Sequence, residues 1–377
     1  MNRLSCLSAA TVLLLLTACS GGSGTRTAPS HGLDLCLRYA ENLRLTDYDG
    51  YSVATIRNPW DTLKTLHTYV LVDTGLPVPQ DLPTRATVVR TPLSHSVVYS
   101  SVHCSLLEQL HALRAIAGVC DLSYIKLQSI HDGCSEGRIT DCGNGMEPDM
   151  ERLIELHPDA LLLSPFENSA GYGSVEKLGV PLIECADYME TSAIGRAEWM
   201  LFYGRLFGRE AEADSLFRVV ETRYLQLCEL AAGAESAPTV FCELRYGSAW
   251  YVPGGRSTTG RLLGDACGQY VFAGDGHSGS VPLSFETVFD AAGEAEFWTF
   301  KYHRATDMTY ADLSADYAGY AAFKAYRSRK VYGCNTAKVA FYEEAPFRPD
   351  YLLADYIQIL HPELGDLGGL RYFSALR

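Results

Sequence analysis

The sequence predicts an α/β protein with two lobes joined by a helical segment and preceded by a β-hairpin. Short apolar runs alternate with helical patterns over residues 85–190, and the alternation resumes over residues 233–377. Such alternation is typical of parallel strands whose crossover helices cover both faces of a sheet. Between the lobes, residues 191–232 have helical periodicity with few breakers, which predicts one long helix or two consecutive helices.

The first 18 residues have the features of a secretory signal peptide. Arg3 gives a positively charged start, and residues 9–16 are an apolar stretch too short to span a bilayer as a stable helix. Leu16-Thr17-Ala18-Cys19 then resembles the lipobox of bacterial lipoproteins, in which the cysteine is acylated after cleavage. We therefore expect Cys19 to anchor the chain on the periplasmic side of a bacterial cell envelope. An ordinary signal peptide with an incidental cysteine is the alternative.

Residues 19–32 predict a flexible tether, because Gly, Ser and Thr dominate them. An N-terminal extension over residues 33–84 follows. It contains two strand-like runs, YSVATI and HTYVLV, separated by the breaker cluster Asn58-Pro59-Trp60-Asp61. This pattern predicts a β-hairpin.

Charge and cysteine usage exclude some functions. The net charge of −14 repels nucleic acid, so we expect no nucleic-acid partner. No CxxC pair occurs among the 12 cysteines, which disfavours a redox or zinc motif. Cys134 and Cys142 flank a Gly-rich loop, and we predict that they form a disulfide in an oxidising compartment.

Two helices are predicted to begin in the same way, one in each lobe. Asp149 is followed two positions later by Glu151, and Ser284 is followed by Glu286. Asp and Ser are good N-cap residues, and a glutamate in the first turn is stabilised by the helix dipole. Both glutamates are expected to face solvent.

Several segments together resemble the periplasmic substrate-binding proteins of ABC importers for iron complexes and cobalamin. The segments are VVYSSVHCSLLEQLHALRAIAGVCD, DMERLIELHPDALLLSP, GRAEWMLFYGRLFGREAEAD, YRSRKVYGCNT and RPDYLLADYIQILHPEL, and the resemblance covers about residues 86–365. It implies a monomer with two Rossmann-like lobes, joined by a single long helix, that hold a metal chelate. An ABC permease with its ATPase is the implied partner, and Glu151 and Glu286 match the acidic positions that dock on the permease. The resemblance implies neither a cofactor nor catalysis.

Ligand contacts are expected in the loops that follow the strands, where α/β folds collect functional groups. In the first lobe, the candidates are Ser101, His103 and Tyr172; in the second, they are Trp250, Tyr251, Arg256, His277 and Tyr302. Aromatic walls suit a broad chelate, Arg256 suits a carboxylate or phosphate, and His103 or His277 could occupy an open metal position. Structural roles are the alternative, with Tyr251 and Tyr302 capping cores and His103 ending a helix.

The cargo is left open by these patterns. An iron complex, as ferric siderophore or haem, is favoured over a corrinoid. A lipid-anchored enzyme is the competing class, but residues 276–280 lack the last glycine of a nucleophile elbow, and residues 255–262 lack the lysine of a phosphate loop. A passive adhesion module would not need aromatic side chains after the strands.

Overall fold

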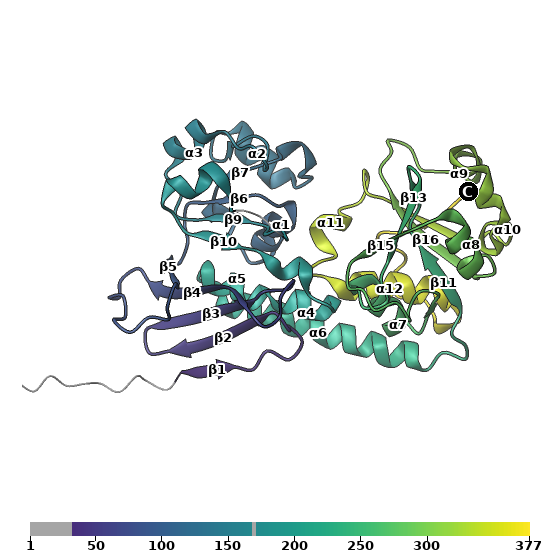
Figure 1. Cartoon of the computed structure of the whole chain (residues 1–377), viewed down its shortest axis with the longest axis horizontal. Coiled ribbons are helices and arrows are strands. Elements are labelled where there is room, and N and C mark those ends of the chain that lie inside the picture. Colours follow the sequence, from purple (N-terminus) through teal and green to yellow (C-terminus); the bar gives the residue numbers. More distant parts are fainter. Residues whose placement is uncertain (1–31, 168–170) are drawn as a thin grey trace, which may run out of the picture. The chain divides into compact units, whose positions relative to one another are not determined.

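The computed structural model describes residues 32–167 and 171–377 (Figure 1). The predicted signal peptide, Cys19 and nearly all of the predicted tether lie outside these ranges. None of the helices within them combines the length and apolar character that a membrane span needs.

The N-terminal sheet has five strands in sequence order. They are β1 (Leu33–Leu35), β2 (Leu43–Tyr48), β3 (Tyr51–Arg57), β4 (Thr65–Asp73) and β5 (Thr87–Thr91). The predicted hairpin is confirmed as β3 and β4, which pair antiparallel. Asn58 closes its loop by accepting hydrogen bonds from the backbone N–H groups of Trp60 and Asp61. Strand β5 falls within the range given to the first lobe, yet it pairs parallel to β4 and so extends this sheet.

The first parallel sheet has the strand order β10-β9-β6-β7-β8. Its strands are β6 (Ser96–Val98), β7 (Ile116–Val119), β8 (Thr140–Asp141), β9 (Leu161–Leu163) and β10 (Leu182–Glu184), and its connecting helices are α1 (Ser101–Gln109), α2 (Gln128–Ser135) and α3 (Met150–Leu156). Every pairing is parallel. Helix α1 begins at Ser101, because the Ser100 side chain caps it by accepting from the Val102 N–H.

Residues 191–232 form three helices where one or two were predicted: α4 (Ala193–Glu198), α5 (Met200–Leu206) and α6 (Glu210–Ala232). Gly208 separates α5 from α6 and has a φ of +62°, which suits glycine. Phe202 and Leu206 of α5 share one buried cluster with Leu45 and Ile56 of the N-terminal sheet. The sheet thus packs on this helical segment.

The second sheet has the order β14-β11-β16-β17-β18 and is parallel except for β18. Its strands are β11 (Thr239–Cys242), β14 (Gln269–Tyr270), β16 (Phe297–Tyr302), β17 (Val331–Asn335) and β18 (Ser374–Ala375). A small antiparallel sheet contains β12 (Arg245–Tyr246), β13 (Ala249–Pro253) and β15 (Ser280–Leu283). The helices are α7 (Thr258–Asp265), α8 (Phe285–Ala292), α9 (Tyr310–Asp316), α10 (Lys324–Arg327), α11 (Phe341–Glu344) and α12 (Pro349–Leu360). The predicted α/β class is confirmed.

Both predicted helix starts are confirmed. The Asp149 carboxylate accepts from the backbone N–H groups of Glu151 and Arg152, and the Ser284 hydroxyl accepts from the Thr287 N–H. Glu151 and Glu286 are exposed in the first turns of α3 and α8. Short 3-10 helices connect other elements, at Leu113–Ala115, Leu122–Tyr124, Gly173–Leu178, Ala186–Met189, Ala318–Ala322 and Pro362–Leu364.

The predicted disulfide is absent from the structure, where Cys134 and Cys142 are free thiols. The two side chains pack into different cores. Cys142 lies in a buried cluster with Cys120 and Leu161, whereas Cys134 packs against the larger cluster that contains Ile130. Proximity along the chain therefore did not predict the direction of the side chains.

Candidate functional site

A cavity of about 510 Å³ lies at the carboxyl edge of the first parallel sheet. Tyr99 and Ser100 follow β6, Asp121 follows β7 and Ser164 follows β9, and all four line it. The remaining lining residues are Gly145, Met146, Pro148, Leu163, Phe166, Gly171, Tyr172, Gly173 and Val175. This first-sheet pocket occupies the edge where α/β sheets bind ligands.

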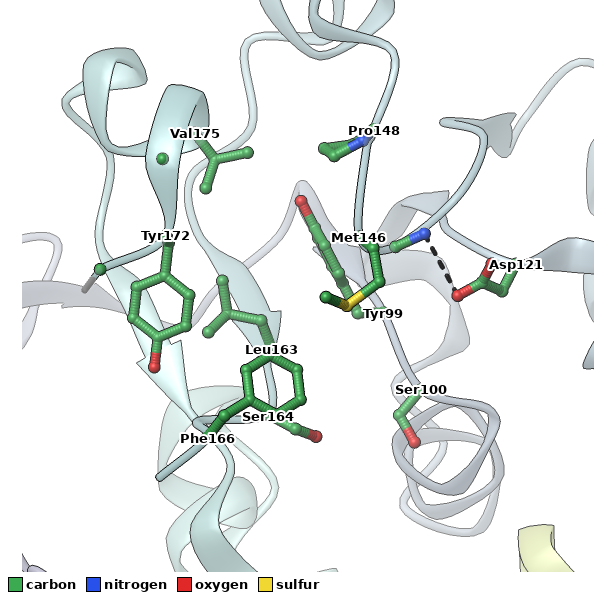
Figure 2. Close-up of a pocket in the computed structure, with 13 residues that line it drawn as sticks. Tyr99, Ser100, Asp121, Met146, Pro148, Leu163, Ser164, Phe166, Tyr172 and Val175 are labelled. Atoms are coloured by element: carbon green, nitrogen blue, oxygen red, sulfur yellow. Dashed lines mark hydrogen bonds between the residues drawn. The ribbon is translucent and has the colours of Figure 1, made fainter. Parts of the chain in front are cut away.

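The first-sheet pocket has mainly apolar walls. Figure 2 shows Tyr172 and Leu163 on one side of the cavity and Tyr99 and Met146 on the other. Asp121 accepts a hydrogen bond of 3.2 Å from the Gly145 N–H, which fixes the loop after β8. These walls suit a ligand with a broad apolar surface.

Tyr172 is held in place by a neighbouring carboxylate. Its hydroxyl donates to Glu184 Oε1 at 2.7 Å. Burial and this acceptor raise the pKa of Tyr172, so the phenol is neutral at physiological pH. Its ring is thus a fixed, uncharged wall of the pocket.

A second cavity, of about 450 Å³, lies beside the second sheet and is polar. Glu243 follows β11, Lys301 lies in β16, and Thr258 and Thr259 begin α7. The other lining residues of this second-sheet pocket are Tyr188, Arg196, Leu244, Tyr246, Tyr251, Pro253, Ser257, Ser278, Gly279 and Ser280. Serine and threonine hydroxyl groups and three charged side chains, Arg196, Glu243 and Lys301, contribute to its walls.

Arg196 and Lys301 are each fixed by a carboxylate. Arg196 Nε donates to Asp187 Oδ2 at 2.9 Å, and the Lys301 ammonium pairs with Glu243. The fully buried Asp187 also accepts from His103 Nε2 at 2.9 Å and from the Tyr203 hydroxyl at 2.8 Å. Despite the burial of Asp187, His103 and Arg196 lower its pKa to about 2, so it is ionised.

Two of the predicted ligand residues line the pockets: Tyr172 the first and Tyr251, which is 47% exposed, the second. Ser101 begins α1 directly after the pocket residue Ser100. Arg256 and His277 are exposed outside the pocket walls, where the Arg256 N–H donates to the His277 carbonyl at 3.1 Å.

Three predicted ligand residues are instead buried, where a ligand cannot reach them: His103 (3% exposed), Trp250 (0%) and Tyr302 (8%). His103 bonds to Asp187, the Trp250 indole donates to the Cys242 carbonyl, and the Tyr302 hydroxyl accepts from the Met308 N–H. The Trp250 indole N–H and the Tyr302 hydroxyl are therefore satisfied inside the fold, whereas His103 Nδ1 is buried without a hydrogen-bond partner among the described residues. In the described ranges, no three His, Cys, Asp or Glu side chains are placed to hold a metal ion.

Sequence reasoning missed Arg196, Lys301 and most of the first-sheet pocket. Tyr99 and Ser100 carried a usable signal, because they directly follow the apolar strand Ser96–Val98. Arg196 carried none, because it lies in an ordinary helical pattern and reaches the pocket only through the tertiary fold.

Comparisons with known proteins show which family and fold this chain resembles. The family model described as "Periplasmic binding protein" matches residues 97–337. An uncharacterized lipoprotein of Methanocaldococcus jannaschii is 26% identical over 350 residues, covering 87% of this chain and 82% of the relative.

Solved structures share the fold at low identity. A periplasmic heme binding protein from Pseudomonas aeruginosa is similar with a TM-score of 0.59 at 15% identity, over 75% of this chain and 98% of that one. An ABC transporter substrate-binding protein from Listeria monocytogenes has a TM-score of 0.55 at 16% identity, over 71% and 98% respectively.

Proposed function

This chain belongs to the periplasmic binding protein family, and we propose that it is the substrate-binding component of an ABC importer that captures an iron complex. The cargo would be a ferric siderophore or haem, delivered unchanged to a membrane permease and its ATPase. The observation that carries the proposal is a pocket beside each of the two parallel sheets.

The proposed architecture assigns one pocket to each of two Rossmann-like lobes. The lobes would span residues 85–190 and 233–377, and the helical segment 191–232 would join them, with α6 as its long helix. One cargo molecule would contact both pockets. A helical connection resists large hinge bending, so binding would use largely preformed walls.

Retention at the membrane is the second part of the proposal. Acylation of Cys19 would confine the protein to the periplasmic side of the envelope, and residues 19–32 would let the binding domain reach the permease. The lipoprotein relative supports this reading. Mass spectrometry of the mature N-terminus tests it, and an unmodified Cys19 would contradict it.

Docking on the permease is assigned to Glu151 and Glu286. Each is exposed in the first turn of a capped helix, so each presents a fixed negative charge to solvent. Two such charges would orient the protein over a basic permease surface and speed encounter.

Cargo binding is tested by equilibrium titration of the purified chain with haemin, a ferric hydroxamate and cyanocobalamin. We expect submicromolar binding of an iron complex. Tyr251→Ala should weaken it, because that ring lines the second-sheet pocket. Tyr124→Ala is the matched control, since Tyr124 is an aromatic residue 76% exposed outside both pockets. Equal loss in both variants, or binding of cyanocobalamin alone, would contradict the iron proposal.

A further inference from the structure

The second-sheet pocket carries two cationic side chains whose role the fold alone does not explain. Arg196 from α4 and Lys301 from β16 line it together with Thr258 and Thr259, and the same four residues line an adjoining cavity of about 220 Å³. We propose that Arg196 and Lys301 bind an oxyanion group of the cargo, a carboxylate foremost, so that the cargo is an anionic chelate. The inference rests on the proposed function and narrows its substrate class.

Arg196 is both fixed and available. Its Nε is used by Asp187, while the side chain stays 21% exposed. Within the part of the chain that the structure describes, its two terminal nitrogens have no hydrogen-bond partner. A guanidinium held at one edge can present its other N–H groups to a carboxylate in the paired geometry that this group favours.

Positive charge exceeds negative charge in this group of side chains. Asp187 is the single carboxylate bonded to both His103 and Arg196. Burial opposes the charge on His103, but its neighbours Cys185 and Asp187 raise its pKa to about 10, so it is a cation at neutral pH. Glu243 balances only Lys301. His103 and Arg196 together carry two positive charges against the one negative charge of Asp187. The group therefore has a net positive charge, and Arg196 is the cation in it that lines the pocket.

Further donors surround the two cations. The hydroxyl groups of Ser278, Ser280 and Thr259 line the same cavity. Helix α7 begins at Thr258, so the positive end of its dipole adds to the potential there. These groups support the cationic pair, which carries the argument.

The first-sheet pocket has the opposite character. Of the described residues that line it, Asp121 is the one with a charged side chain, and Tyr99, Leu163 and Tyr172 make the walls apolar. An oxyanion would be repelled there. A cargo that contacts both pockets would therefore have an apolar body and an acidic edge.

The test compares haemin, which has two carboxylates, with haemin dimethyl ester, in which both are blocked. Titrations use the full chain, as wild type and as the Arg196→Gln and Lys301→Gln variants. Arg218→Gln is the matched control, because Arg218 lies on α6 with a side chain 67% exposed. Cyanocobalamin and a ferric hydroxamate complete the set of probes.

We expect wild type to bind haemin at least about tenfold more tightly than the ester, because the ester cannot form the charged hydrogen bond that the free carboxylate makes. Each pocket variant should weaken haemin by a similar factor without changing ester binding, Arg218→Gln should have no effect, and Arg196→Lys should restore part of the affinity. Circular dichroism checks that each variant folds. If Arg196→Gln does not fold, the haemin affinity of Lys301→Gln tests the proposal.

The failures are distinguishable. Equal affinity for haemin and its ester, or pocket variants without effect, would overturn the anionic-cargo inference while leaving the binding function intact. Binding of cyanocobalamin alone would overturn both this inference and the iron-complex part of the proposed function, while leaving the substrate-binding role intact. Binding of none of the four probes would count against the proposed function itself and remove the inference with it.

Discussion

Replacing Asp187 by Asn should destabilise the protein strongly. The carboxylate is fully buried and accepts hydrogen bonds from His103, Arg196 and Tyr203. Asparagine keeps the shape but removes the charge, so two cations lose their shared partner. Removing one member of a buried ion pair costs about 3–5 kcal/mol. The fall in the Asp187 pKa from 3.8 to about 2 corresponds to a smaller loss of stability, of about 2 kcal/mol.

The assay is urea denaturation followed by tryptophan fluorescence at pH 7. We expect the free energy of unfolding to fall by about 2–5 kcal/mol with an unchanged dependence on urea concentration. The control Asp214→Asn breaks an exposed pair with Arg218 and should leave stability unchanged within error. A fall of less than about 1 kcal/mol in the free energy of unfolding of Asp187→Asn would refute the reasoning, because leaving two buried cations without their carboxylate should destabilise the fold by more than that.

Three further predictions concern pH, the N-terminal segment and transport. Folding raises the His103 pKa from 6.5 to about 10, so the stability that protonated His103 contributes is complete below pH 6.5 and is lost as the pH rises toward 10. Thermal melts should show the melting temperature falling over this pH range. A melting temperature that does not change with pH would contradict the prediction. Glu198 accepts 2.8 Å hydrogen bonds from the backbone N–H groups at positions 38, 39 and 40. Glu198→Gln should therefore lower the free energy of unfolding by about 2–3 kcal/mol and speed hydrogen exchange of these three amides. Unchanged amide exchange would refute this role of Glu198. Reversing both Glu151 and Glu286 to Arg should lower cargo uptake by cells at least tenfold without changing cargo affinity; undiminished uptake would contradict the docking assignment.

Local signals predicted the fold class and the helix starts well. Asp149 and Ser284 cap helices because their side chains satisfy N–H groups within the same turn, which the sequence alone specifies. The hairpin at Asn58 is equally local, since its loop bonds lie within three residues. Interactions between neighbours in sequence need no knowledge of tertiary packing.

Tertiary effects account for the misses. Trp250 is an aromatic residue that could have lined a ligand site, yet it lies within β13 and its ring packs 5.8 Å from that of Trp298 inside the second core. Strand β5 pairs with β4 because of long-range register that no local pattern encodes. Arg196 reaches the second-sheet pocket because Asp187 holds it there. Burial and partner choice depend on residues distant in sequence, so patterns along the chain could not identify them.

The proposed capture of a metal chelate is tested most directly by what the protein carries when purified natively from its own cells. An absorption spectrum together with the metal content per chain gives the answer. The account predicts a visible chromophore and about one iron per chain, with an acidic chelate released on denaturation. A colourless, metal-free protein that also fails to bind added haemin or ferric hydroxamate would contradict it.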